Sequence, residues 1–216
     1  MNRYIADLHF GHKGVLSFDD RPFKTIEEND IELVDRWNRV TDIDDDVYIL
    51  GDISWHGVMK TIDIIQSLNG NKHLIIGNHD KKFLKNKDFR EEFVEIAHYK
   101  EVSDGNKIVV LCHYPIMSYN GMLNGRYHLY GHVHTGVDWN ILKRFEEDLF
   151  EEWKTNDRYG ERLSKENGFR MFNVGCMLPY MNYTPLTLDE IEAGVKEYRS
   201  VHLAFMDIFK PLLAKE

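Results

Sequence analysis

Five short apolar runs, each followed at once by polar residues able to bind a metal ion, constrain the fold of this chain more than any other feature. The runs span residues 4–6, 47–50, 74–76, 108–111 and 127–130. Runs of this length, rich in β-branched and aromatic residues, are typical of buried strands. The polar clusters therefore lie on the loops at the ends of five predicted strands.

Helical patterns separate the first three predicted strands. Ile26, Leu33 and Trp37 lie close to one face of the first predicted helix, and Ile62 and Ile65 share a face of the second. This alternation predicts a parallel β-α-β beginning. In such sheets the carboxyl ends of the strands meet at one edge, so we expect loops that are distant in sequence to meet there.

The second half of the chain has a different pattern. Asp104-Gly105-Asn106 predicts a hairpin turn and residues 169–174 predict a further strand, so we expect a second sheet packed on the first. Residues 139–168 are charged, with apolar residues at helical spacing, and predict a surface helix, a lid over the site being the alternative. Thr187, followed three residues later by Glu190, has the form of a capping box and predicts the start of the C-terminal helix.

Length and composition set the broad class. With 216 residues, 43% of them hydrophobic, the chain suits one core, and we expect a single domain over residues 1–216 with 139–168 as a helical insertion. The N-terminus lacks the basic start and apolar run of a signal peptide, and no apolar stretch is long enough for a membrane span, so we expect a cytoplasmic protein with no membrane partner.

Cys112 and Cys176 lie in apolar stretches and indicate buried free thiols. The formal charge of −9 disfavours nucleic acid as a partner, although bound cations can reverse the field at one site.

Nitrogen and oxygen ligands for two cations follow the five predicted strands. A dinuclear site needs several such ligands, at least one of which can bridge, and an open position for water. Asp52 follows Gly51, which lets the backbone approach closely, and its two carboxylate oxygens could span two metals. The full set is Asp7, His9, Asp52, Asn78, His113, His132 and His134. No thiolate belongs to it, which argues against structural zinc.

Each of these residues has a simpler interpretation when taken alone. Asp7, Asp52 and Asn78 are also typical turn residues. His113 could be a hydrogen-bonded core histidine, and the last two histidines could face solvent from an edge strand. The joint occurrence of this chemistry at all five strand ends favours a metal centre. His73, His98, His128 and His202 have no such context, and we expect them to take no part in the site.

The order and context of these motifs resemble the calcineurin-like metallophosphoesterase superfamily. The motifs are Asp7-x-His9, Gly51-Asp52, Gly77-Asn78-His79-Asp80, an isolated His113 and Gly131-His132-x-His134. The resemblance covers residues 3–138 and resumes at Phe172, and through residues 7–12 and 21–23 the chain is similar to small bacterial and phage phosphoesterases. Residues 139–168 have no counterpart that we can place.

The resemblance implies an α+β fold, a four-layer α-β-β-α sandwich of two packed mixed β-sheets flanked by helices. It implies that one ion is bound by Asp7, His9, Asp52 and His134, and the second by Asp52, Asn78, His113 and His132. It also implies that His79 contacts the phosphate and protonates or stabilises the leaving oxygen, with Asp80 orienting that histidine. Mixed nitrogen and oxygen sites accept Mn, with Fe, Zn, Ni or Co as alternatives.

These features predict a dinuclear metal-dependent hydrolase of phosphomonoesters or phosphodiesters, in which a metal-activated bridging hydroxide attacks a small phosphorylated substrate. A metal-dependent nuclease on DNA or RNA is one alternative. An inactive scaffold is another, although every ligand position and the catalytic histidine are present.

The loops also bear on the substrate. Gly51-Asp52 continues as Ile53-Ser54-Trp55-His56 and lacks the Asp-Arg-Gly continuation of the protein serine/threonine phosphatases, which argues against that activity. His12, Arg21 and His56 could line the substrate side, the alternative being a surface polar role for each.

Overall fold

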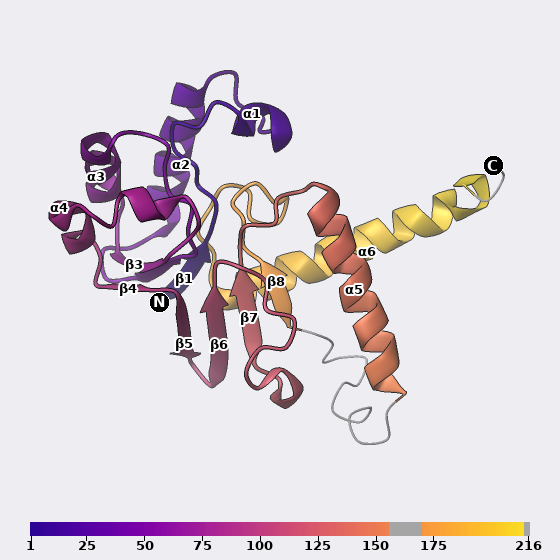
Figure 1. Cartoon of the computed structure of the whole chain (residues 1–216). Coiled ribbons are helices and arrows are strands. Elements are labelled where there is room, and N and C mark those ends of the chain that lie inside the picture. The colour runs from indigo at the N-terminus through magenta and orange to yellow at the C-terminus, as the bar shows by residue number, and fades with distance from the viewer. Residues whose placement is uncertain (156–169, 214–216) are drawn as a thin grey trace.

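The computed structural model describes residues 1–155 and 170–213 as two four-stranded sheets with helices, an α+β arrangement (Figure 1). The first sheet has the order β1-β2-β3-β4 and the second the order β5-β6-β7-β8. The sheets are consecutive in the chain. The division of the sequence into a first and a second half is therefore also a division between the two sheets.

The first sheet is wholly parallel. Its strands are β1 (Asn2–Ile5), β2 (Asp46–Ile49), β3 (Asn71–Ile75) and β4 (Glu95–Ala97). The parallel β-α-β beginning is confirmed, but the expectation that both sheets are mixed is wrong for this one. Helical crossovers return the chain to the same end before each next strand, so the four strands run in the same direction.

The crossovers contain four helices and one 3-10 turn. They are α1 (Val15–Phe18), α2 (Ile26–Val40), α3 (Val58–Ser67), η1 (Asp80–Lys82) and α4 (Lys87–Glu91). Thr25 caps α2, because its side-chain oxygen accepts a hydrogen bond from the Glu28 N–H at 3.1 Å. In Figure 1 all four helices lie on the side of the molecule that carries β1–β4.

The second sheet is mixed. The strand β5 (Tyr99–Asp104) pairs antiparallel with β6 (Lys107–Cys112), whereas β7 (Tyr127–Tyr130) and β8 (Met171–Asn173) continue from β6 in parallel. The predicted hairpin turn is confirmed, with Gly105 at a φ of 60°. A short 3-10 helix, η2 (Met122–Asn124), precedes β7.

Two long helices follow β7 and β8. The helix α5 (Val137–Lys154) covers the described part of the segment 139–168 and packs Trp139 and Leu142 against the core, as a surface helix does, while residues 156–168 lie outside the described residues. The helix α6 (Leu188–Leu213) begins at the predicted capping box. There the Glu190 carboxylate accepts from the Thr187 N–H at 2.8 Å, and Thr187 Oγ1 accepts from the Glu190 N–H at 3.4 Å.

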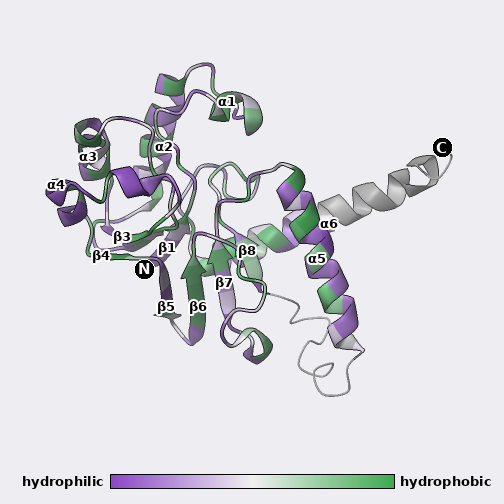
Figure 2. Ribbon diagram, viewed as in Figure 1, coloured by the Kyte–Doolittle hydropathy of each residue, from purple (hydrophilic) through white to green (hydrophobic). Residues whose placement is uncertain are grey.

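One hydrophobic cluster joins the two sheets. It contains Ile5 and Leu74 from the first sheet together with Val109 and Leu129 from the second, all of them wholly buried. In Figure 2, β6 at the centre of the molecule is coloured as hydrophobic, which fits a strand covered on both faces. Within the described residues, no helix combines the length and the apolar character needed to cross a membrane.

Candidate metal centre

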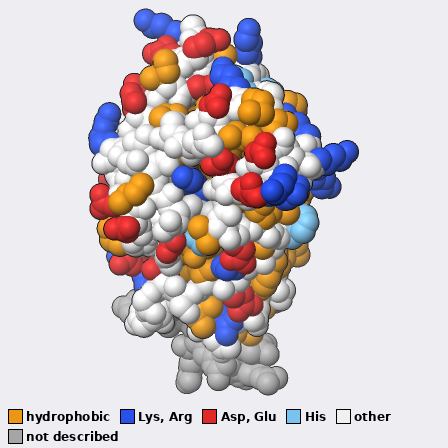
Figure 3. Space-filling model, turned by 90° about the vertical axis from the view of Figure 1, so that its left-hand side faces the viewer, with side chains coloured by type: hydrophobic (Ala, Val, Ile, Leu, Met, Phe, Trp, Pro, Cys, Tyr) orange, Lys and Arg blue, Asp and Glu red, His pale blue; other side chains and the backbone are white. Residues whose placement is uncertain are grey.

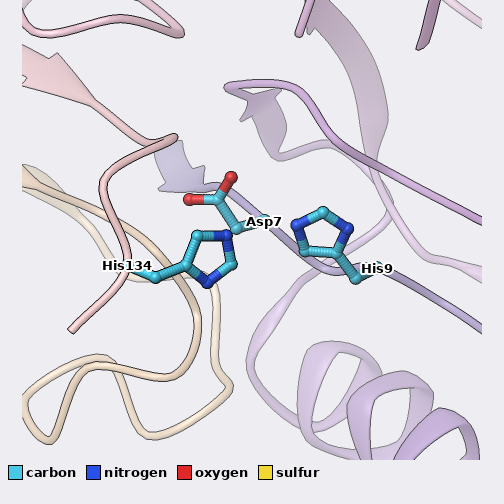
Figure 4. Close-up of side chains that lie close together, drawn as sticks. All are labelled: Asp7, His9 and His134. Atoms are coloured by element: carbon cyan, nitrogen blue, oxygen red, sulfur yellow. The ribbon is translucent and has the colours of Figure 1, made fainter. Parts of the chain in front are cut away.

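Two groups of side chains that could hold a metal ion form where strands of the two sheets end. One group is Asp7, His9 and His134, and the other is Asp52, His113 and His132. Within each group, one ligand atom from each residue lies within 4.8 Å of the others. Figure 4 shows the Asp7 carboxylate beside the rings of His9 and His134. These two histidines are far apart in the sequence, and both belong to the set of ligands predicted from it. The loops predicted to meet in space do meet.

The backbone is strained at four of these six residues. Asp7, His9, Asp52 and His132 have φ angles of 57°, 51°, 57° and 68°, in the left-handed region that side chains disfavour. Such strain persists only where the surrounding structure fixes it, and it clusters at functional sites. These loops are therefore shaped to aim the side chains at one place, and not to make the most relaxed turn.

Glycines let the loops approach closely. A Cβ on Gly51, which has a φ of 84°, would lie 2.6 Å from both Gly77 N and His113 Nδ1. A Cβ on Gly77 would collide with the Asp52 carboxylate. The loops after β2 and β3 can therefore be this close only because both residues are glycine.

Asp19 sets the orientation of His134. Its carboxylate lies 2.7 Å from His134 Nδ1, so Nδ1 donates a hydrogen bond and the other ring nitrogen is the one available to a metal. Burial lowers the pKa of His134, but the hydrogen bond to Asp19 and the charges of Asp7 and Asp19 outweigh it, so the pKa is raised. Asp19 was missed in the sequence, where the only signal is its place two residues before Arg21.

Asp7 is wholly buried, and burial raises its pKa to about 7. Its carboxylate accepts from the His132 N–H at 3.0 and 3.2 Å, which ties the loop after β1 to the loop after β7. A buried carboxylate with so high a pKa lacks a full counter-charge. A divalent cation beside it would supply one.

His9 contacts Trp55 and Asp52. The Trp55 indole N–H donates to His9 Nδ1 at 3.1 Å, so a neutral His9 carries its proton on Nε2. That nitrogen is buried without a hydrogen-bond partner and lies 3.8 Å from an Asp52 carboxylate oxygen. A cation at Nε2 would require the proton to move to Nδ1, where the Trp55 N–H now lies.

Acceptor atoms converge in the second group. His113 Nδ1 donates to the Leu50 carbonyl at 2.7 Å, so its Nε2 carries a lone pair, and this nitrogen lies 3.0 Å from Asn78 Oδ1 and 3.6 Å from an Asp52 oxygen. Burial lowers the pKa of His113, which favours this unprotonated form. The His132 ring lies 5.1 Å from that of His113. A lone pair facing two oxygens is repulsive unless a cation lies among them.

One carboxylate oxygen of Asp52 lies between the two groups. It is 3.8 Å from His9 Nε2 and 3.6 Å from His113 Nε2, and it is also 3.9 Å from His79 Nε2. The other Asp52 oxygen accepts from the His79 N–H at 2.9 Å. Asp52 therefore has the position that a bridging ligand needs, and the nitrogen and oxygen donors around it fit divalent cations.

Asp80 contacts the backbone of the loops that carry the proposed ligands. Its wholly buried carboxylate accepts from the backbone N–H groups of Asp52, Ile53 and Gly77, at 2.9, 3.0 and 2.8 Å. It therefore fastens the loop after β2 to the loop after β3, and no hydrogen bond joins it to the His79 ring among the described contacts. These contacts hold the loop that carries Asp52, and the expected orientation of His79 by Asp80 stays a prediction.

Of the three residues expected on the substrate side, only His12 has a side chain that lies beside the ligand groups without a hydrogen-bond partner among the described contacts, whereas Arg21 and His56 are held by other residues. His12 lies beside the first ligand group, its ring centre 4.4 Å from that of Trp55 and 5.6 Å from that of His9. Arg21 does not face a substrate, because its side chain is wholly buried and donates to the Asp7 and Leu8 carbonyls and to Asp19.

His56 is also engaged elsewhere. Its Nε2 lies 2.7 Å from an Asp30 oxygen, and its ring fills the space beside Gly11. The aromatic residue that reaches the site from this loop is the preceding one, Trp55, whose ring centre is 4.6 Å from that of His79.

Comparison with known proteins finds relatives without a stated activity. The chain is 34% identical over 132 residues to the uncharacterized protein MJ1445 of Methanocaldococcus jannaschii, covering 60% of this chain and 67% of that protein. It is 38% identical over 88 residues to the gene 66 protein of Mycobacterium phage L5, of which it covers 42%. No family model matches the chain.

Solved structures support the fold. A protein of unknown function, AQ665 from Aquifex aeolicus, superposes with a TM-score of 0.60 at 24% identity, over 89% of this chain and 98% of that one. Pseudomonas putida nuclease MPE superposes with a TM-score of 0.40 at 22% identity, over 62% of this chain and 60% of that one. The E. coli phosphoesterase Yfce superposes with a TM-score of 0.31 at 15% identity, over 61% of this chain and 68% of that one. TM-scores this low do not establish a shared fold, so the chemistry has to be argued from the side chains.

Proposed function

The chain belongs to the same family as the uncharacterized protein MJ1445, and from the geometry of its candidate metal centre we propose that it is a dinuclear metal-dependent hydrolase of phosphoester bonds. The observation that carries this proposal is the place of Asp52, one oxygen of which lies within 3.8 Å of a histidine from each ligand group. A four-layer α-β-β-α order of sheets and helices belongs to the same proposal.

The proposed ligand sets follow the two groups. Asp7, His9 and His134 hold one cation and His113, His132 and Asn78 the other, with Asp52 shared between them. Bound divalent cations would acidify a water for attack and neutralise charge on the phosphate. Manganese is the first candidate, with Fe, Zn, Ni or Co as alternatives, because mixed nitrogen and oxygen sites accept all of them.

His79 is the proposed proton donor. Its side chain is 38% exposed, whereas the side chains of Asp52 and His113 beside it are buried, so it can reach a substrate from the open side. Its backbone N–H, bonded to Asp52, fixes its place relative to the ligands. In hydrolysis the oxygen of water bonds to phosphorus, the ester P–O bond breaks, and protonated His79 donates to the oxygen that leaves.

The experiment compares hydrolysis and metal content in one set of variants. The manganese-loaded protein should hydrolyse p-nitrophenyl phosphate or bis-p-nitrophenyl phosphate, and Asp52→Asn should lose both metal and turnover. His79→Ala should keep its metal and lose about 10²- to 10⁴-fold in rate. Asp63→Asn, an exposed aspartate on α3, is the matched control and should behave as the unaltered protein does.

Four outcomes would contradict the proposal or one of its parts. Equal loss of metal in His79→Ala and Asp52→Asn would refute the division of roles. Failure to bind manganese, or bound metal without hydrolysis of either ester, would favour the inactive scaffold. Faster cleavage of labelled oligonucleotides than of the small esters would favour the nuclease.

A further inference from the structure

Exposed aromatic side chains gather around the candidate metal centre. Among residues 1–200 whose side chains the structure describes, four aromatic side chains have large exposed fractions, namely Phe18, Trp55, Tyr99 and Tyr114, at 51, 41, 43 and 42%. All except Tyr99 contact histidines of the proposed site. We call Phe18, Trp55 and Tyr114 the aromatic rim.

Two members of the rim lie beside the first ligand group. The ring centre of Phe18 is 5.3 Å from that of His134 and 5.6 Å from that of His12, which in turn is 4.4 Å from Trp55. Trp55 then lies 4.6 Å from His79. These rings form an unbroken aromatic strip that runs from α1 to the proposed proton donor.

Tyr114 lies beside the second ligand group. Its ring centre is 4.7 Å from that of His132 and 4.9 Å from that of His113. Exposed aromatic surface therefore borders both halves of the metal centre, from segments that are far apart in the sequence. Trp55 lies on the same loop as Asp52 and Tyr114 directly follows His113, so any molecule bound at the metals lies within reach of the rim.

Exposing three large rings to water around one polar site is unfavourable unless something covers them. A planar ring is a fitting partner, because aromatic faces and edges attract one another beyond the area that they bury. From this arrangement we propose that the substrate is a small phosphate ester whose organic part carries a planar aromatic ring, which packs on the rim while the phosphate lies at the metals. The inference rests on the proposed phosphoester hydrolysis.

Charge favours a small substrate over a nucleic-acid strand. The chain carries a formal charge of −9, and binding of a strand needs a row of Lys and Arg along its phosphates. Among the described residues one cation lies over a ring of the rim, Lys82, with its Nζ 5.3 Å from the Trp55 ring centre. On the face shown in Figure 3, acidic and basic side chains are intermixed and do not form a basic stripe.

Adenosine 5′-monophosphate and ribose 5-phosphate test the inference, because they share the leaving oxygen and differ in the base. Calorimetric titration of the manganese-loaded protein should show at least about tenfold tighter binding of the nucleotide, in the range that base–aromatic stacking gives. Trp55→Ala should remove most of this preference and Tyr114→Ala part of it. Trp55→Phe, which keeps a ring but loses the N–H, should retain most of it, and Tyr99→Ala should retain all of it.

The outcomes separate this inference from the proposed function. Hydrolysis of simple phosphoesters with equal affinity for the two ligands would overturn the inference and leave the proposed function standing. Absence of any phosphoester hydrolysis would overturn the proposed function, and the inference with it. Tighter binding of an oligonucleotide than of the mononucleotide would replace the small substrate by a strand. Metal content, measured in every variant, shows whether the Trp55 variants act through the ligand His9.

Discussion

The Asp19 carboxylate lies 2.7 Å from Nδ1 of His134 and thereby fixes which nitrogen of that ring points toward Asp7. The same carboxylate accepts two hydrogen bonds from Arg21, at 3.2 and 3.1 Å, and the side chains of both residues are wholly buried. A carboxylate behind a metal-binding histidine orients the ring and raises its basicity. Arg21, Asp19 and His134 therefore act as one unit behind the proposed first metal.

Substitution of Asp19 should weaken metal binding without removing a ligand. In Asp19→Asn the amide has no charge to hold the His134 proton or to pair with Arg21, so we expect about 10- to 100-fold weaker manganese binding. Titration with manganese under equilibrium dialysis measures this. The exposed neighbour Asp20→Asn is the control. The same affinity in both variants would show that Asp19 has no such part.

Substitution of Asp80 should lower the stability of the protein and weaken its metal binding. Asp80 accepts from three backbone N–H groups, and the amide in Asp80→Asn can accept through one oxygen only. A buried donor left without a partner costs about 1–3 kcal/mol, so we expect that loss in the free energy of unfolding, together with weaker metal binding. Denaturant unfolding and elemental analysis measure both. Full stability and full metal with slow turnover would instead indicate that Asp80 acts on His79.

His128 should make the protein less stable in acid. Its Nδ1 donates to the Val110 carbonyl at 3.0 Å and its Nε2 accepts from the Ile116 N–H at 2.9 Å, so the buried ring is neutral. Burial lowers its pKa from 6.5 to about 4 and outweighs the hydrogen bond to the Val110 carbonyl, which raises it. The unfolded chain then takes up a proton as the pH falls below 6.5 and the folded chain does not, so stability is lost until the pH reaches about 4.

The expected loss for His128 is on the order of 2 kcal/mol between pH 7 and pH 5. Urea unfolding of the protein and of His128→Gln at pH 7 and at pH 5 measures this loss. The contribution of His128 is the difference between the two proteins, because the titration of other groups is common to both. The variant, although less stable at pH 7, should lose less stability on acidification. An equal loss in both proteins would contradict the assignment.

Metal binding should change the fluorescence of Trp55. A cation at His9 Nε2 requires the histidine proton at Nδ1, and two N–H groups cannot face each other there, so the Trp55 indole N–H must shift enough to break its hydrogen bond to His9. Manganese added to chelator-treated protein should therefore change the emission, and a chelator should reverse the change. Trp139→Phe, in the core, should keep this response and Trp55→Phe should lose it. An unaltered response in Trp55→Phe would contradict this account of His9.

The sequence predicted the features that depend on local pattern. The strands β1, β2, β3, β6, β7 and β8 were predictable because each is an apolar run bounded by turn residues. The groups around Asp52 were predictable because their members follow the ends of strands in both sheets. The strand β4 has three residues and β5 alternates on an exposed edge, so neither forms an apolar run, and β5 is indicated only by the hairpin turn that follows it.

Residues that act through tertiary contacts were not predictable. Asp19 and Trp55 reach the site only because α1 and the loop after β2 fold over it, and nothing in the neighbouring sequence shows this. Arg21 and His56 were candidates because they are polar residues in loops. The structure buries the first against Asp19 and pairs the second with Asp30.

The number of metal ions per chain is the decisive measurement for a dinuclear centre bridged by Asp52. We expect two manganese ions per chain by elemental analysis after equilibrium dialysis, and fewer than one in Asp52→Asn, because both sites share that carboxylate. His132→Ala should retain one ion, held by Asp7, His9 and His134. A single ion in the unaltered protein, or two ions retained in Asp52→Asn, would contradict the dinuclear centre bridged by Asp52.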